Sequence, residues 1–162
     1  MGQYDTAQIC LNGHVSNDSV GRSPQFNKKF CEICGEKTIV NCPQCSTPIR
    51  GDYISDHMII GPSNYTPPAY CYNCGNAFPW TEAKIKATMD LVKESKKLNA
   101  VEIKEFEESI KDIVRDTPKT QLGASRFKKI LNKAGSETSH AIRETIVDII
   151  SETAKKIIWP NN

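Results

Sequence analysis

Hydrophobic and polar residues follow different patterns in the two halves of the chain. From Trp80 onward, apolar residues recur every three or four positions between charged ones. That spacing is typical of amphipathic helices, which bury one face. Residues 1–79 instead contain short apolar runs separated by Cys, Gly, Pro and Asn. The pattern predicts a two-part chain, with a small module over residues 1–79 and an α-helical region over residues 80–162.

The helical region is predicted to hold four helices. Thr81 is the expected N-cap of the first. Asn99, with Glu102 three residues later, has the spacing of a capping box and starts the second. A short third helix is expected to end near Gly135, because glycine suits a helix C-terminus. We expect the apolar stripes of these three helices to pack against one another in a small bundle.

The last helix is predicted to run without a break from Glu137 to Trp159. Its seam positions, 142, 146, 149, 150, 153 and 157, repeat every three or four residues. Three shorter helices leave part of such a face uncovered, so we expect it to dock a protein partner or a second copy of the chain. Burial of this stripe in the chain's own core is the other interpretation. A membrane-surface effector acting through this amphipathic helix is an alternative. The sequence has no long uncharged apolar run, so no transmembrane segment is expected.

The first half is organised around cysteines. The chain has seven cysteines, all between residues 10 and 74, and one histidine stands in register with them. The paired candidate ligands are Cys10 with His14, Cys31 with Cys34, Cys42 with Cys45, and Cys71 with Cys74. Four pairs give eight ligands, which make two complete tetrahedral zinc sites and leave no cysteine over. An odd cysteine count in CxxC pairs also argues against a disulfide framework and favours a reducing, cytoplasmic setting.

Two arrangements of these pairs are open. In the sequential one, the first two pairs hold one zinc and the last two hold the other, so each site is a zinc ribbon of short antiparallel strands. In the interleaved one, alternate pairs share a metal. We favour the sequential arrangement, because Thr38-Ile39-Val40 can form a strand that completes the first ribbon. The fold class predicted is therefore α+β, with tandem zinc ribbons followed by helices.

The segment 46–70 between the third and fourth pairs contains four prolines and is predicted to be a long irregular loop, with an edge strand at most. Arg50-Gly51-Asp52 within it is interpreted as a turn after a metal-binding pair. His57 is a spare candidate ligand, but it has no partner at ligand spacing. We interpret it as a solvent-facing loop histidine.

Both zinc ions are expected to be structural. A catalytic zinc keeps an open position for water, whereas each predicted site has four strong ligands. The sequence has no HExxH motif and no HxE followed by PCxxC. No catalytic residue and no further cofactor is predicted, and the protein is not expected to be an enzyme.

Four motifs resemble a bacterial zinc-ribbon family of unknown function. They are MGQYDTAQICLNGHV at the start, FCEICGEKTI, CPQCSTPIRG and CYNCGNAFPWTE. The resemblance covers residues 1 to about 82. It implies a small bacterial protein, supports the same eight residues as zinc ligands, and adds no catalytic residue.

The net charge of the first module distinguishes protein binding from nucleic-acid binding. Residues 1–79 contain five Lys/Arg and six Asp/Glu. Zinc loading would add about −1 at a Cys₃His site and −2 at a Cys₄ site, so the loaded module would carry about −4. Proteins that bind nucleic acid need Lys and Arg side chains to neutralise its phosphates, whereas the zinc-loaded module would be negatively charged. We therefore expect a non-enzymatic adaptor or scaffold that recognises a protein partner through the ribbon surface and the helices.

Nucleic-acid binding is the other alternative, and it would use the helical half. Residues 80–162 hold sixteen basic and thirteen acidic residues. Their densest basic cluster comprises Arg126, Lys128, Lys129 and Lys133.

Overall fold

The computed structural model describes residues 2–55 and 64–161. The chain divides into two compact units, Met1–Ala83 and Lys84–Asn162. The sequence placed a boundary between residues 79 and 80, at the start of helix α1 (Pro79–Glu94). His57 lies outside the described residues.

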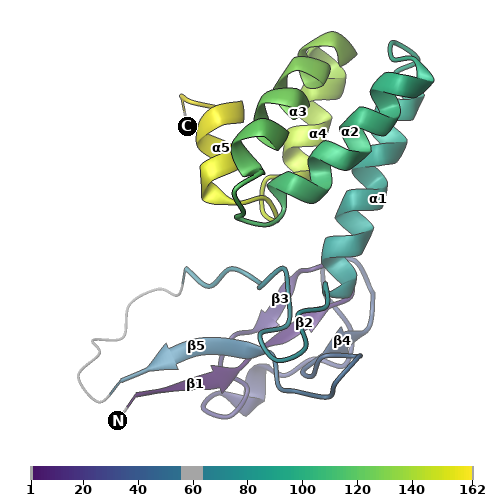
Figure 1. Ribbon diagram of the computed structural model, residues 1–162. Coiled ribbons are helices and arrows are strands. Elements are labelled where there is room, and N and C mark those ends of the chain that lie inside the picture. Colours follow the sequence, from purple (N-terminus) through teal and green to yellow (C-terminus); the bar gives the residue numbers. More distant parts are fainter. Residues whose placement is uncertain (1, 56–63, 162) are drawn as a thin grey trace. The chain divides into compact units, whose positions relative to one another are not determined.

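The first unit contains two small antiparallel sheets (Figure 1). β1 (Gln3–Thr6) pairs with β5 (Arg50–Ile54). β2 (Gln8–Cys10) lies between β3 (Val15–Asn17) and β4 (Thr38–Ile39). A short 3₁₀ helix, η1, covers Pro24–Phe26. Together with five α-helices, these strands confirm the α+β fold class and the strand predicted at Thr38.

The interpretation of Arg50-Gly51-Asp52 as a turn is wrong. These residues form the first part of β5, whose partner strand β1 comes from the extreme N-terminal segment. A side chain at Gly51 would clash with the backbone, since its Cβ would lie 2.2 Å from the Asp18 carbonyl oxygen. The backbone N–H of Asp52 donates to that same oxygen at 2.8 Å. This close approach of two backbone segments explains why a glycine interrupts an otherwise side-chain-rich strand.

The hydrophobic core of the first unit is small and includes metal-site cysteines. Its buried members are Ala7, Ile9, Cys42, Ile49, Cys71, Phe78 and Trp80. The rings of Phe78 and Trp80 stack with centroids 4.6 Å apart. The indole N–H of Trp80 donates to the Pro68 carbonyl at 2.9 Å. Units with so small a core among their described residues are typically stabilised by a bound metal ion or by disulfides.

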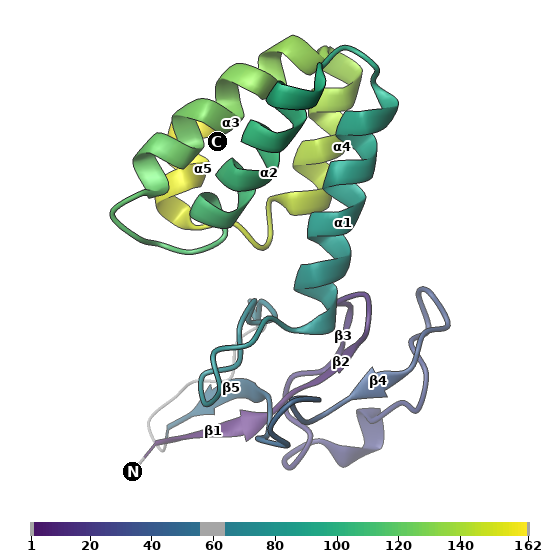
Figure 2. The same cartoon turned by 45° about the vertical axis from the view of Figure 1, so that its right-hand side comes forward.

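The second unit is helical. After α1 it contains α2 (Ala100–Ile113), α3 (Thr120–Ala134), α4 (Ser136–Ile146) and α5 (Glu152–Ile158). α3 packs against α2, α4 and α5, as Figure 2 shows for α2. The rings of Phe106 and Phe127 stack between α2 and α3 with centroids 4.6 Å apart. None of the helices in the described ranges is both long and apolar enough to cross a membrane.

Helix ends test the local predictions. The capping box at Asn99 is confirmed, because its side chain accepts from the Glu102 N–H while the Glu102 carboxylate accepts from the Asn99 N–H. Gly135 follows the end of α3, as predicted. The prediction that Thr81 caps the first helix is wrong: α1 already begins at Pro79, a residue suited to the first helical position. The Thr81 hydroxyl donates instead to the Ala69 carbonyl at 2.8 Å.

The prediction of one unbroken last helix is also wrong. α4 ends at Ile146, and α5 begins at Glu152 with Ser151 as its N-cap. The Ser151 backbone N–H donates to the carbonyl of Ile113 at 2.8 Å. The intervening residues place Ile149 and Ile150 in the core of the second unit, where they are 5% and 4% exposed. Tertiary packing has overridden a helix-compatible pattern.

The expected docking seam is therefore absent. Of the six seam positions, Ile142, Ile146, Ile149 and Ile150 are buried within the second unit, and Thr153 and Ile157 are half-buried. The four buried side chains form the chain's own core and offer no face to a partner helix or to a membrane surface. Of the two interpretations of the stripe, burial within the chain is the one that the structure supports.

We predict that Ile146→Asp strongly destabilises the second unit. The buried Asp carboxylate would contact neither water nor a cation, which should lower the free energy of unfolding by on the order of 3 kcal/mol or more. Loss of far-UV circular dichroism on heating should occur at a clearly lower temperature. Val101→Asp is the matched control, because Val101 is 75% exposed on α2 and should tolerate the charge. A stable Ile146→Asp variant that has changed from dimer to monomer would instead place this residue at an interface.

Candidate metal centres

The eight predicted ligands come together in two clusters. Cys10, His14, Cys31 and Cys34 form the first cluster, and Cys42, Cys45, Cys71 and Cys74 form the second. Within each, one ligand atom from every residue lies within 4.8 Å of the others. The grouping is the sequential one, so the interleaved arrangement is wrong.

The sulfur–sulfur distances have the size of a tetrahedron around one metal ion. Sγ of Cys10 lies 3.8 Å from Sγ of Cys34. In the second cluster, Cys42 to Cys74 is 3.8 Å and Cys45 to Cys71 is 3.7 Å. Metal–sulfur bonds of about 2.3 Å at tetrahedral angles give an edge of about 3.8 Å. A disulfide would need about 2.05 Å, and all seven cysteines are free thiols.

His14 completes the first tetrahedron through its Nδ1 atom. Nδ1 lies 3.5 Å from Sγ of Cys10 and 3.6 Å from Sγ of Cys31. A tetrahedral edge between nitrogen at about 2.0 Å and sulfur at about 2.3 Å from the metal is about 3.5 Å. The donor sets therefore fit a thiolate-binding tetrahedral ion, with three sulfurs and one nitrogen in the first cluster and four sulfurs in the second.

Three of the four ligand pairs share one backbone turn. The N–H of the first cysteine donates to the carbonyl five residues later, at 2.8 Å for Cys31, 2.8 Å for Cys42 and 2.9 Å for Cys71. The N–H four residues after that cysteine returns a bond to the cysteine's carbonyl, at 2.8, 2.9 and 2.9 Å respectively. This turn orients both thiols of a pair toward the same point. The repeated geometry explains why CxxC spacing predicted these three pairs.

The fifth residue of each turn has a left-handed backbone. Gly35 and Gly75 occupy this position with φ of 73° and 71°, and Ser46 occupies it with φ of 60°. A side chain at positive φ is unfavourable, which is why glycine is the usual residue there. Ser46 is thus the one strained member of an otherwise equivalent set of turns.

The remaining pair, Cys10 and His14, joins β2 to β3. Gly13 has φ of 91°, and a Cβ there would lie 2.9 Å from Cβ of Trp80, so the turn packs directly on the core of the first unit. The backbone N–H of His14 lies 3.3 Å from Sγ of Cys10 and donates to it. The separation of four positions between Cys10 and His14 is set by this tight, glycine-dependent turn.

Polar neighbours of the sulfurs were not predicted from the sequence. Nδ2 of Asn12 donates to Sγ of Cys34 at 3.5 Å, and Nδ2 of Asn76 donates to Sγ of Cys74 at 3.4 Å. The Thr47 hydroxyl lies 3.3 Å from Sγ of Cys45. Thr47 and Asn76 both stand two residues after the second cysteine of a turn. That shared position is the sequence signal that could have identified them.

These neighbours, together with burial, give the thiols within each cluster different pKa values. The backbone N–H of Glu36, followed by the Asn12 amide, lowers the pKa of Cys34 to about 6. The Thr47 hydroxyl and its backbone N–H lower the pKa of Cys45 to about 6. Burial raises the pKa of Cys42 to about 11 and also raises the pKa of Cys10. Each cluster therefore combines a thiol that ionises readily with one that needs a nearby cation to do so.

The two clusters differ in burial. Cys42 and Cys71 belong to the hydrophobic core of the first unit. In the first cluster Cys10 and Cys31 are buried, but Cys34 is exposed. A metal in the second cluster would therefore be held by the core itself, whereas a metal in the first would lie at the surface on one side.

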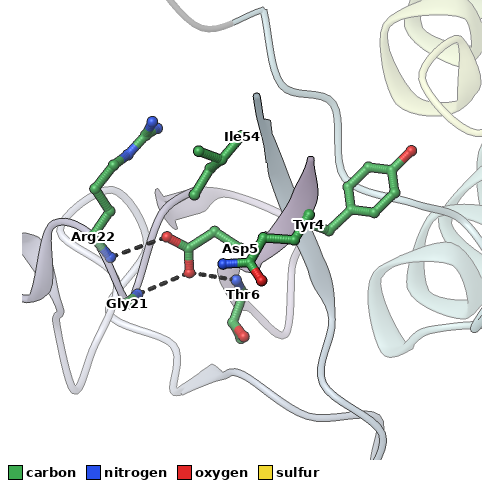
Figure 3. A pocket seen from close by; sticks show the side chains of 7 residues that line it. Tyr4, Asp5, Thr6, Gly21, Arg22 and Ile54 are labelled. Carbon is green, nitrogen blue, oxygen red and sulfur yellow. Dashed lines mark hydrogen bonds between the residues drawn. The ribbon is translucent and has the colours of Figure 1, made fainter. Parts of the chain in front are cut away.

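A shallow pocket of about 350 Å³ lies elsewhere on the first unit (Figure 3). Its carboxylate, Asp5, accepts from the backbone N–H groups of Thr6, Gly21 and Arg22 at 2.6, 2.9 and 3.0 Å. Partial burial raises the pKa of Asp5, but these three donors outweigh it, so the pKa lies below its usual range. Two of the three donors, Gly21 and Arg22, belong to the neighbouring loop. Its hydrogen bonds tie that loop to β1.

The basic cluster of the helical half lies on α3, and most of its charge is engaged there. Arg126 Nε lies 3.8 Å from a carboxylate oxygen of Glu105, and Lys133 forms an ion pair with Glu102. Lys128 Nζ donates to the Ile157 carbonyl at 3.0 Å. Three of the four cations proposed for phosphate binding thus contact acceptors of the second unit, which weakens the case for a nucleic-acid surface.

We predict opposite effects for matched substitutions at the shared turn position. Ser46→Gly should stabilise the first unit by up to about 1 kcal/mol, because glycine relieves the positive φ. Gly35→Ser and Gly75→Ser should destabilise it by a similar amount. A Cβ at either glycine would meet no atom within 4 Å, so the effect isolates backbone conformation. Chemical unfolding of the metal-loaded chain measures all three; a Ser46→Gly variant that is less stable than the parent would contradict the account.

Comparison with known proteins supports the sequence resemblance. No curated protein and no solved structure matches the chain. A family model does match, over residues 3–158, and therefore covers both units. Its description is uncharacterized protein conserved in bacteria (DUF2321). The chain belongs to this bacterial family.

Proposed function

We propose that the protein is a non-enzymatic binding module in which two structural zinc ions hold the first unit together and its surface recognises another protein. The observation that carries the proposal is the pair of four-ligand clusters with tetrahedral edges. An ion in either cluster would have every coordination position filled by the chain. Such a closed site stabilises a fold and has no position for substrate or activated water.

Zinc is the metal that best suits both donor sets. Cys₃His and Cys₄ sets are typical of structural zinc sites, whereas iron would be expected chiefly at an all-sulfur site. The cation would also supply the positive charge that the buried thiol of Cys42 needs in order to ionise. The seven free thiols agree with a reducing compartment, and we propose the cytoplasm.

Electrostatics favour a protein over a nucleic acid as the partner. With both clusters loaded, the first seventy-nine residues would carry about −4, from five basic residues, six acidic residues and the two metal–thiolate centres. A polyanion would be repelled by this unit. In the second unit, the cations of α3 are largely paired with the chain's own acceptors.

Metal content tests the first part of the proposal. We expect two zinc ions per chain, and Cys34→Ser and Cys74→Ser should each reduce this to one. Structural zinc contributes on the order of 10 kcal/mol to the folding of small modules, so loss of the second site should also unfold the core of the first unit. Ile33→Ala is the control, because Ile33 lies between two ligands but is 74% exposed, and it should keep both ions. Iron in place of zinc, or a disulfide-bonded chain without metal, would disprove this part.

Nucleic-acid binding tests the second part. Fluorescence anisotropy with single-stranded and duplex oligonucleotides should show weak or no binding at about 0.15 M salt, because three of the four cations in the densest basic cluster already contact acceptors of the chain. Replacement of Lys128, Lys129 and Lys133 by alanine should change little. Tight binding that falls steeply with salt and is lost in that triple variant would instead make the helical half a nucleic-acid interface.

A further inference from the structure

We infer that the first unit carries a docking surface for an acidic protein segment, centred on Arg50; this rests on the proposed protein-binding function. The surface, here the tyrosine–arginine patch, consists of Tyr4, Arg50, Tyr53 and Tyr72. It is formed by β1, β5 and the turn between Cys71 and Cys74. All four side chains are exposed.

The patch is a continuous row of contacts. The rings of Tyr53 and Tyr4 meet edge to face with centroids 5.1 Å apart. The guanidinium carbon of Arg50 lies over the Tyr4 ring, 4.9 Å from its centroid, and over the Tyr72 ring, 3.8 Å from its centroid. Arg50 is therefore an interior member of the row, with aromatic neighbours toward both ends. Exposed tyrosines and arginine are the residue types that dominate the binding energy of protein interfaces.

The backbone beneath the patch is fixed. The Tyr65 hydroxyl donates to the Arg50 carbonyl at 2.6 Å. The adjacent Gly51 is buried against the carbonyl of Asp18, as described above. Tyr72 is held by the hydrogen-bonded turn that begins at Cys71. A side chain that is stacked on rings over a fixed backbone loses little entropy on binding, which favours affinity.

Arg50 has stacking partners but no counter-ion among the described residues. Two acids close to Arg50 along the paired strands are already engaged: Asp5 by three backbone N–H groups, and Asp52 by Arg22 at 3.3 Å. Stacking covers the face of a guanidinium and leaves the N–H groups at its edge available. Those groups form a planar fork that matches the two oxygens of a carboxylate or phosphate.

The surrounding charge selects between these anions. A polyphosphate chain would bring many negative charges close to a unit that is already negative when loaded. A single carboxylate pairs with Arg50, while its apolar neighbours can lie on the tyrosine rings. Because Arg50 is inside the row, the bound chain continues past the carboxylate in both directions. The occupant that fits is an extended protein segment with an internal Asp or Glu flanked by aromatic, proline or aliphatic residues.

A displayed library of random twelve-residue peptides, selected against the zinc-loaded full-length chain, tests the inference. The enriched peptides should share an internal Asp or Glu. Synthetic copies should bind Arg50→Gln and Arg50→Lys at least about tenfold more weakly, since lysine keeps the charge but lacks the planar fork. Replacing the peptide's Glu by Gln should weaken binding to the parent chain by a similar factor and should add little further loss in Arg50→Gln.

Lys29→Gln is the matched control. It removes the same charge from the same unit, and Lys29 also lies over an exposed ring, 5.8 Å from the Phe30 centroid. It should leave peptide binding unchanged. Zinc content of every variant, measured in parallel, shows that the first unit is intact.

Each other outcome overturns the inference. No enriched peptide, or peptides without an acid whose binding ignores Arg50, would remove the patch as an acidic-segment site; the latter result would leave the proposed protein-binding function standing on another surface. Oligonucleotide binding that depends on Arg50 would overturn both this inference and the proposed protein-binding function. Loss of binding in Lys29→Gln equal to that in Arg50→Gln would reduce the effect to net charge.

Discussion

The convergence of eight ligand side chains on two points is the constraint on which the first unit depends. Its apolar core contains five residues besides the buried cysteines Cys42 and Cys71. Thiols at these spacings repel one another once ionised, and burial raises the pKa of Cys42 to about 11. A bound cation reverses both costs, because it pairs with every thiolate at once. In the proposed zinc-bound state, metal binding and folding of this unit are therefore one equilibrium.

The same constraint determines what the surface presents. Backbone turns around the ligands face inward to hydrogen-bond the cysteines, so the intervening side chains, such as Ile33 and Tyr72, point to solvent. Tyr72 thereby reaches Arg50 on the neighbouring strand. A module stabilised by the proposed zinc ions would not need these side chains for its core. They remain exposed and available to bind a partner, whereas the apolar residues of the second unit are used to stabilise that unit.

The ligands could be predicted from the sequence because their chemistry is local. A CxxC pair needs only a short turn to bring its two thiols together, and cysteine is itself a typical zinc ligand. The capping box at Asn99 was predictable for the same reason. The pairing of β1 with β5 was not, since some forty residues separate the strands and their contact depends on Gly51 fitting against Asp18. The break between α4 and α5 could not be predicted either, because an isoleucine stripe fits one long helix as well as two short ones. The break is accompanied by a tertiary hydrogen bond from the Ser151 N–H to the Ile113 carbonyl, which the sequence does not reveal.

The central claim is that each cluster holds one zinc ion through the chain's own ligands alone. X-ray absorption at the zinc edge of the purified, full-length chain tests this most directly. The account predicts seven sulfur neighbours at about 2.3 Å and one nitrogen neighbour at about 2.0 Å, summed over two ions. Fewer sulfurs, or oxygen neighbours in their place, would mean open coordination and would contradict closed structural sites.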